Sequence, residues 1–476
     1  MNERGRKNNM KKSIARNYIY NLIYQMLTIL LPLVTTPYLS RVLGAEPIGI
    51  YGYTISIVTY FVLFGTLGIS MYGQRETAYK GDNIAERSKV FWELIIIRTI
   101  TLSISMLLFY MIYGRTGEYT IYYRILLIQL VANLFDISWL FQGIEEFEKT
   151  VVRNLVVKLL SLILIFTVIK TPNDLWKYFA IYVGAELLGN ITLWLYLPQY
   201  IEKVSIKKLD LKKHIKPVIS LFLPQIAIQI YTVLDKTMIG SIVEDKSEVG
   251  FYEQAQKMIK LLITISTALG TVMVPRMAST FAKGDKKKLR EYMDRSFQFV
   301  LMLVFPLMFG MISIANKFVP IFYGSGYEKV IILINIIVPI VLAIGLSNVI
   351  GTQYLLPTKR QKEYTISVVC GAIVNFIMNI CLIWNWGAIG ASIGTVIAEL
   401  TVTLVQIYFV REDFDFKEIF KLSRKYLVSS IIMFIVCITL KKFINNNLIS
   451  TIVQVISGGI IYMVCLLILK DKFIFE

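Results

Sequence analysis

Residues 17–40 read NYIYNLIYQMLTILLPLVTTPYLS, a run of apolar and neutral polar residues without one charged side chain. About 20 such residues are enough for an α-helix to cross the hydrocarbon core of a bilayer. The rest of the 476-residue chain is similar, since 56% of its residues are hydrophobic and only 17% are charged. Soluble domains carry roughly a quarter charged residues, so this composition excludes a set of water-soluble domains. Because the apolar runs are continuous rather than alternating, they predict membrane-spanning helices.

The pattern predicts an all-α integral membrane protein with about 14 transmembrane helices. The connections between these helices are too short to fold as soluble domains. The expected spans cover residues 17–40, 48–72, 90–113, 120–143, 150–170, 176–197, 217–241, 249–274, 293–315, 328–356, 364–383, 388–410, 425–443 and 449–469.

The formal net charge of the chain is +18. Lys and Arg residues collect in the two terminal tails and in the even-numbered connections, which is typical of the cytosolic side of a membrane protein. The excess positive charge therefore indicates an orientation with both termini in the cytosol, and contact with anionic lipid rather than nucleic acid.

The chain offers little for catalysis or metal binding. Its four cysteines all lie in apolar runs, without the spacing of a disulfide framework or a zinc site, and His214 is the single histidine. The sequence also has no nucleotide-binding loop of the Walker type. We expect no metal, no cofactor and no catalytic residues.

An internal repeat divides the chain. IGIYGY at 48–53 recurs as VGFYEQ at 249–254, and KGD at 80–82 recurs at 283–285. The matches keep the same order, which predicts two parallel six-helix lobes and two further C-terminal helices, an arrangement typical of secondary transporters. The expected parts are a basic cytosolic tail at 1–16, an N-lobe at 17–200, a cytosolic linker at 201–216, a C-lobe at 217–410 and two appended spans within 424–470.

Several longer stretches resemble one family of transporters. They are YNLIYQMLTILLPLVTTPYLSRVLGAEPIGIYGY at 20–53, LFGTLGISMYGQRE at 63–76, DISWLFQGIEEFEKT at 136–150 and YTVLDKTMIG at 231–240. The chain is similar to the Wzx-type polysaccharide-biosynthesis flippases of the multidrug/oligosaccharidyl-lipid/polysaccharide exporter superfamily. The resemblance implies a bacterial plasma-membrane protein that is not an enzyme. It would move undecaprenyl-diphosphate-linked oligosaccharide repeat units to the outer leaflet by alternating access.

The chain departs from the pattern of its relatives at two places. Proton-coupled multidrug members often carry an acidic residue in the first helix, where this chain has Asn21, Gln25 and Thr28. Lipid II flippases place arginines along helices 1, 2 and 8, whereas span 1 here has only Arg41 at its outer end and span 8 carries lysines. The resemblance therefore implies the fold and the substrate class, but no coupling residue.

The most informative polar residues lie on spans 7 and 8. Glu253, Lys257 and Lys260 are spaced i, i+4 and i+7, which places them on one face of a helix. Because a charge in mid-membrane is costly, we expect this face to line a cleft between the lobes. Asp235 on span 7 lies at about the same depth and is expected to pair with Lys257 or Lys260. Two alternatives stay open: the charges snorkel to the outer interface, or the pair is a static structural contact.

The candidate site residues fall into three groups. Arg98 has a guanidinium that fits phosphate oxygens, and it joins the lysines as a candidate diphosphate ligand. The candidate diphosphate ligands are Lys257, Lys260, Lys236, Arg98 and Arg41; the candidate ion-pair or coupling residues are Asp235, Glu253, Asp136, Glu186 and Glu399; and the candidate polar lining is Asn21, Gln25, Gln225 and Gln229.

Two other functions remain as alternatives. A multidrug or small-cation exporter of the same superfamily would share the fold, although an acidic, aromatic cleft would suit its substrates better than a cleft with lysines. A membrane-embedded polysaccharide polymerase is the enzymatic alternative. The expected partners are undecaprenyl-diphosphate oligosaccharide, membrane lipids and the polysaccharide polymerase machinery.

Overall fold

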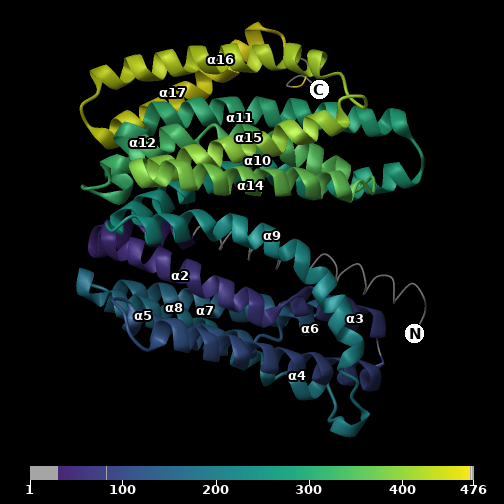
Figure 1. Ribbon diagram of the computed structural model, residues 1–476. Helices are drawn as coiled ribbons and strands as arrows, with labels where there is room; N and C mark the ends of the chain where they lie inside the picture. The colour runs from purple at the N-terminus through teal and green to yellow at the C-terminus, as the bar shows by residue number, and fades with distance from the viewer. Residues whose placement is uncertain (1–30, 82, 472, 474–476) are drawn as a thin grey trace. The chain divides into compact units, whose positions relative to one another are not determined.

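The computed structural model of the protein describes residues 31–81, 83–471 and 473, without the side chains of residues 223–225, 227, 228, 230, 231 and 271 (Figure 1). Every regular element in these residues is helical, as the apolar runs predicted. The chain divides into two compact units, Met1–Val233 and Leu234–Glu476. This division falls within a helix, α9 (Lys212–Ile242), rather than in the expected linker at 201–216.

The first unit contains the helices that precede α9. Residues 31–43 are helical, and α4 continues into one turn of π-helix at Tyr110–Gly114. The other helices are α2 (Ala45–Thr66), α3 (Ile69–Lys80), α4 (Ile84–Phe109), α5 (Thr120–Leu134), α6 (Ser138–Gly143), α7 (Phe147–Val168) and α8 (Leu175–Trp194).

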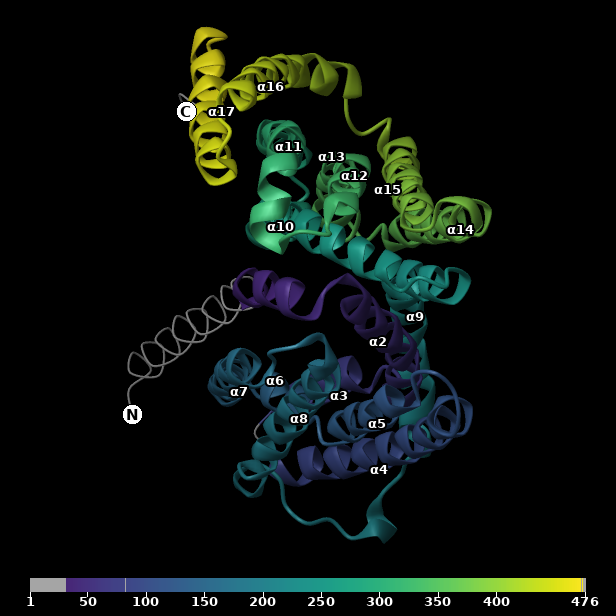
Figure 2. The ribbon, with the colours of Figure 1, turned by 90° about the vertical axis from the view of Figure 1, so that its left-hand side faces the viewer.

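The second unit begins in α9. Its helices are α10 (Ser247–Ala282), α11 (Lys286–Tyr323), α12 (Glu328–Ile337), α13 (Ile340–Ser347), a π-helical stretch at Asn348–Leu355, α14 (Gln361–Trp386), α15 (Ala388–Val410), α16 (Phe416–Phe443) and α17 (Asn447–Ile468). In Figure 2, α16 and α17 lie on one side of α11, and the pair α14–α15 lies on the other. The core between α11, α16 and α17 includes Phe305, Tyr426, Met433 and Tyr462.

Twelve helical segments of the described residues are long and apolar enough to cross a membrane, where the sequence predicted fourteen. Of the two other predicted spans, 17–40 lies mostly outside the described residues and 217–241 is part of α9. The outward sides of the twelve carry large apolar side chains, such as Leu404 at 64% exposure, as lipid-facing helices do. The chain is therefore a multi-pass membrane protein.

Three predicted spans are interrupted helices. The span at 48–72 breaks between α2 and α3, the span at 120–143 between α5 and α6, and the span at 328–356 between α12 and α13. Pro339 lies in the third break, where its missing N–H removes one helical hydrogen bond. Hydropathy did not locate these breaks, because it reports only that a segment is apolar.

A buried polar network holds the expected linker and the start of α9 against the first unit. Glu93 of α4 is fully buried and accepts a hydrogen bond from the Asp210 N–H at 2.7 Å. Its carboxylate also contacts Lys213 Nζ at 2.8 Å and His214 Nε2 at 2.7 Å. The other ring nitrogen of His214 lies 2.8 Å from the Tyr72 hydroxyl. The single histidine is thus part of a structural contact that fixes where α9 begins.

We expect Glu93→Ala to destabilise the protein by about 3–5 kcal/mol, because it leaves the buried partners of this carboxylate without their acceptor. Glu86→Gln is the matched control on the same helix, since the Glu86 side chain is exposed and its ion pair with Lys80 is long, at 3.7 Å. Thermal unfolding in detergent measures both effects. Equal melting temperatures for the two variants would contradict this role of Glu93.

Candidate functional site

Two consecutive residues of α9 contact two consecutive residues of α10 in the second unit. The carboxylate of Asp235 accepts a hydrogen bond from the Tyr252 hydroxyl, and Lys236 Nζ lies 3.8 Å from a carboxylate oxygen of Glu253. Because neighbouring side chains on a helix diverge by about 100°, these two contacts belong to separate networks. One network is charged, and the other is neutral apart from Asp235.

The charged network joins one carboxylate to two lysines. Glu253 lies 3.0 Å from Lys257 Nζ, one turn along α10, and it also pairs with Lys236. The Glu253 side chain is 11% exposed, whereas those of Lys236 and Lys257 are 25% and 37% exposed. We call these three residues the lysine triad. Its net charge is +1, and its cations are more accessible than its anion.

The expected pair between Asp235 and Lys257 or Lys260 is not formed, and this prediction was wrong. Glu253 precedes Lys257 by four residues and therefore reaches it along the same helix face. Lys260 is exposed, and among the described residues no carboxylate pairs with it. Whether the triad faces a cleft stays a prediction from the sequence.

The second network surrounds Asp235, which is 7% exposed. Besides Tyr252, its carboxylate accepts hydrogen bonds from the Asn379 amide at 2.6 Å and the Thr395 hydroxyl at 2.9 Å. Asn379 also donates to the side-chain oxygen of Asn375 at 3.2 Å. All these partners are neutral. In the part of the chain that the structure describes, Asp235 is therefore a buried anion without a cationic partner.

Two atoms of this network lack partners within the described residues. They are the amide nitrogen of Asn375 and the amide oxygen of Asn379, and both side chains are fully buried. A buried carboxylate with neutral neighbours is costly unless a positive charge joins it. Carboxylate, amide and hydroxyl oxygens are ligands for hard cations. One carboxylate balances one charge, so Asp235, Asn375, Asn379 and Thr395 fit a monovalent cation.

A third polar cluster lies in the first unit at the break between α5 and α6. Arg98 of α4 is 1% exposed, donates to the Asp136 carbonyl at 2.9 Å and lies 3.8 Å from the Asp136 carboxylate. The same carboxylate accepts the Ser138 N–H at 3.0 Å and so begins α6. Arg98 was predicted to bind the diphosphate. Its side chain is instead buried inside the first unit, where it pairs with Asp136.

Other side chains pair with the carbonyl groups that the break leaves without helical partners. Asn190 donates to the Ala132 carbonyl at 2.7 Å, and the Trp194 indole donates to the Phe135 carbonyl at 2.8 Å. Glu186 accepts a longer bond from Asn133 at 3.3 Å. The predicted residues Asp136 and Glu186 therefore lie in a cluster that supports an interrupted helix, a feature that membrane proteins tolerate only where the backbone is paired.

Of the remaining predicted residues, Arg41 is exposed, while Glu399 and Gln229 are half-buried on α15 and α9. Asn21 and Gln25 lie outside the described residues, as does the side chain of Gln225.

Sequence analysis missed the neutral members of the Asp235 network. They are Tyr252, Asn375, Asn379 and Thr395. A signal was present, because two asparagines spaced i, i+4 within the apolar stretch of α14 share one buried helix face. A buried amide on a membrane helix needs a hydrogen-bond partner, as a buried charge does. The spacing of the two asparagines therefore indicated a buried polar contact.

Comparisons with known proteins identify the family and the fold. The family model "Polysaccharide biosynthesis protein" matches residues 14–281, and the model "Lipid II flippase MurJ" matches residues 150–457. A relative from Escherichia coli (strain K12), named "Putative O-antigen transporter", is 27% identical over 85% of this chain and 99% of its own length. The lipid II flippase MurJ of Bacillus subtilis (strain 168) is 24% identical over 44% of this chain.

Solved structures share the fold. The lipid II flippase MurJ in an inward closed conformation superposes with a TM-score of 0.78 at 17% identity, over 96% of this chain and all of that one. An inward-facing multidrug resistance MATE family transporter of the MOP superfamily gives a TM-score of 0.62 at 13% identity, over 85% of this chain and 99% of its own. At these identities the likeness shows the fold alone.

We expect Na⁺ to raise the melting temperature of the purified protein relative to choline, because an ion that binds only the folded state stabilises it. Asp235→Asn should abolish the Na⁺ effect, and Asp210→Asn, in the exposed linker, should keep it. A Na⁺ response that survives in Asp235→Asn would contradict the site.

Proposed function

The chain belongs to the polysaccharide biosynthesis protein family, and from this premise we propose that it is a lipid-linked oligosaccharide flippase. Its substrate would be an undecaprenyl-diphosphate-linked repeat unit, moved from the inner to the outer leaflet of a bacterial plasma membrane for capsule or another surface polysaccharide. Relatives that match over most of this chain are named as O-antigen transporters, which supports the substrate class. The family comprises transporters, so we set the polymerase alternative aside.

The lysine triad is the observation that carries this proposal. A diphosphate headgroup cannot enter hydrocarbon without a large desolvation cost, so its path needs cations and hydrogen-bond donors. Lys236 on α9 and Lys257 on α10 supply both, and each keeps part of its side chain accessible. A small-cation exporter would gain nothing from two lysines, because they repel a cationic substrate.

Glu253 gives the triad two states. Without substrate, this carboxylate holds both ammonium groups and limits the cost of keeping them in an apolar region. A diphosphate presents more negative charge and more acceptor oxygens than one carboxylate, so it competes for the lysines. We propose that the lysines move from Glu253 to the diphosphate on binding and return on release.

We propose that the Asp235 network couples this exchange to an ion. Asp235 and Lys236 are neighbours on α9, and Tyr252 and Glu253 are neighbours on α10. A change in the spacing of the two helices therefore acts on both networks at once. We propose that a monovalent cation at Asp235 fixes the helix pair, and that its entry and departure drive alternating access. Both termini face the cytosol in this scheme.

We expect Lys257→Gln and Lys236→Gln each to slow flipping by about tenfold or more, because each removes a cation from the path of the diphosphate. The assay follows a fluorescent undecaprenyl-diphosphate oligosaccharide in proteoliposomes. Lys257→Arg should retain much of the rate, since it keeps the charge.

Lys421→Gln, an exposed residue of α16, is the matched control and should flip at the wild-type rate. Wild-type rates in both triad variants would contradict the role of the lysines. A lack of flipping by the wild-type protein would contradict the proposed function itself.

A further inference from the structure

A cavity of about 650 Å³ opens at the end of the second unit where α14 meets α15. Its volume lies within the range of roughly 300–1,000 Å³ that small-molecule sites occupy. The polar and aromatic residues that line it are Asp245, Glu248, Lys329, Trp384, Asn385 and Trp386. None of these residues belongs to the networks around Asp235 and Glu253.

The floor of this cavity is held rigidly. Only Gly387 separates α14 from α15, and its φ of +53° is a backbone conformation that favours glycine. One carboxylate oxygen of Glu248 accepts the Ala388 N–H at 2.9 Å, and the other pairs with Lys329 of α12. A Cβ at Gly387 would lie 2.7 Å from the Glu248 carboxylate, so the turn and the carboxylate fit closely. These contacts hold the Glu248 carboxylate against the turn between α14 and α15.

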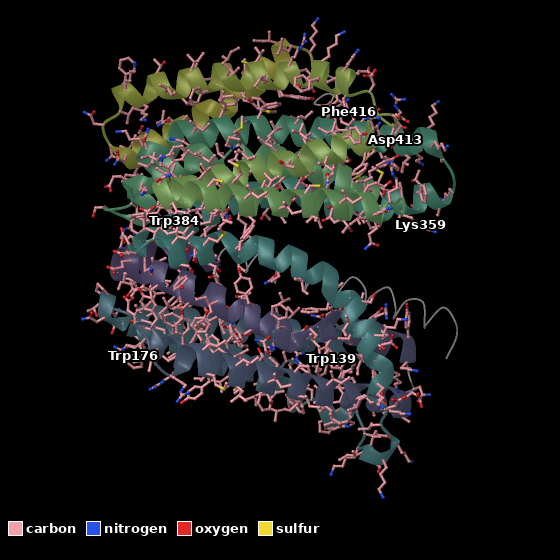
Figure 3. The ribbon with its side chains drawn as sticks, viewed as in Figure 1. Trp139, Trp176, Lys359, Trp384, Asp413 and Phe416 are labelled. Carbon is pink, nitrogen blue, oxygen red and sulfur yellow. The ribbon has the colours of Figure 1, made fainter. Side chains whose placement is uncertain are left out.

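The rim carries the groups that are free to bind. Trp384, at the end of α14 (Figure 3), is 72% exposed, and Trp386 is 53% exposed. Asn385 lies between them, and within the described residues its amide has no hydrogen-bond partner. The exposed Asp245 carboxylate accepts the Ser247 N–H at 2.8 Å and keeps further acceptor capacity. Two exposed tryptophans thus line the cavity together with polar groups that can accept or donate hydrogen bonds.

We infer that this cavity is a carbohydrate subsite, which contacts the glycan part of the transported molecule. This inference rests on the proposed function. A sugar ring has apolar C–H faces, which pack on the electron-rich face of an indole, and hydroxyl edges, which need fixed donors and acceptors. With the proposed orientation, the cavity lies at the outer end of the second unit, where the glycan emerges.

The charges of the cavity disfavour the diphosphate as its occupant. Asp245 and Glu248 carry two negative charges against one positive charge on Lys329, which leaves a net charge of −1. The same balance would attract an organic cation, which also binds aromatic faces. Tryptophans are common at membrane interfaces. The test therefore needs a control tryptophan at an interface that does not line this cavity. Trp176, near the start of α8 and 48% exposed, provides it.

The experiment measures glycan binding to the full-length protein in nanodiscs by titration calorimetry. The probe is neutral oligosaccharide released by mild acid from the lipid-linked fraction of the producing bacterium, and tetraethylammonium is the cation probe. We expect Trp384→Ala/Trp386→Ala to weaken glycan binding about tenfold or more, and Trp384→Phe/Trp386→Phe to weaken it less. Trp176→Ala should bind like the wild type.

Three results would overturn the subsite. They are unchanged glycan binding in the double alanine variant, an equal loss in Trp176→Ala, and tryptophan-dependent binding of tetraethylammonium without binding of glycan. Flipping of the lipid-linked oligosaccharide by the wild-type protein is measured in parallel. If the wild type flips the lipid-linked oligosaccharide but its affinity for the glycan does not depend on the two tryptophans, only the subsite fails. If the wild type does not flip, the proposed function fails.

Discussion

The cost of placing charge in an apolar medium governs the arrangement of this protein. Every ionisable group on a membrane helix needs a partner, since hydrocarbon offers neither hydrogen bonds nor counter-ions. In the first unit, Arg98 meets this need through the backbone and the carboxylate of Asp136. In the second unit, Glu253 meets it with two lysines. Asp235 differs from both, because its described partners are neutral.

The neutral surroundings of Asp235 distinguish the polar chemistry of the second unit from that of the first. A buried carboxylate without a cationic partner can bind a cation. A lysine that is paired with a carboxylate can exchange this partner for another anion. Asp235 and the lysine triad lie side by side on α9 and α10, so the proposed cation binding and the proposed lysine exchange would depend on the same pair of helices. The first unit has a more structural polar chemistry, in which Asn190, Trp194 and Arg98 pair with the carbonyl groups of an interrupted helix.

The sequence was sufficient for the helical class, most of the spans and the residues of the triad, because hydropathy and helical spacing are local properties. It did not predict which acid would hold the lysines, although Glu253 is one turn from Lys257. It also missed Asn379 and Thr395, which are 144 and 160 residues from Asp235 along the chain. Contacts between distant helices depend on packing, which hydropathy does not encode. The break at Asp136 was missed for the same reason, since its donors come from α4 and α8.

The central claim is that ion binding at Asp235 and diphosphate binding at the lysine triad are coupled. The most direct measurement is the affinity of the purified protein for undecaprenyl diphosphate with and without Na⁺, together with its affinity for Na⁺ with and without that lipid. Linkage requires the two ratios to be equal. We expect equal ratios that differ clearly from one in the wild type, and ratios of one in Asp235→Asn. Lipid affinity that is the same with and without Na⁺ in the wild type would contradict the claim.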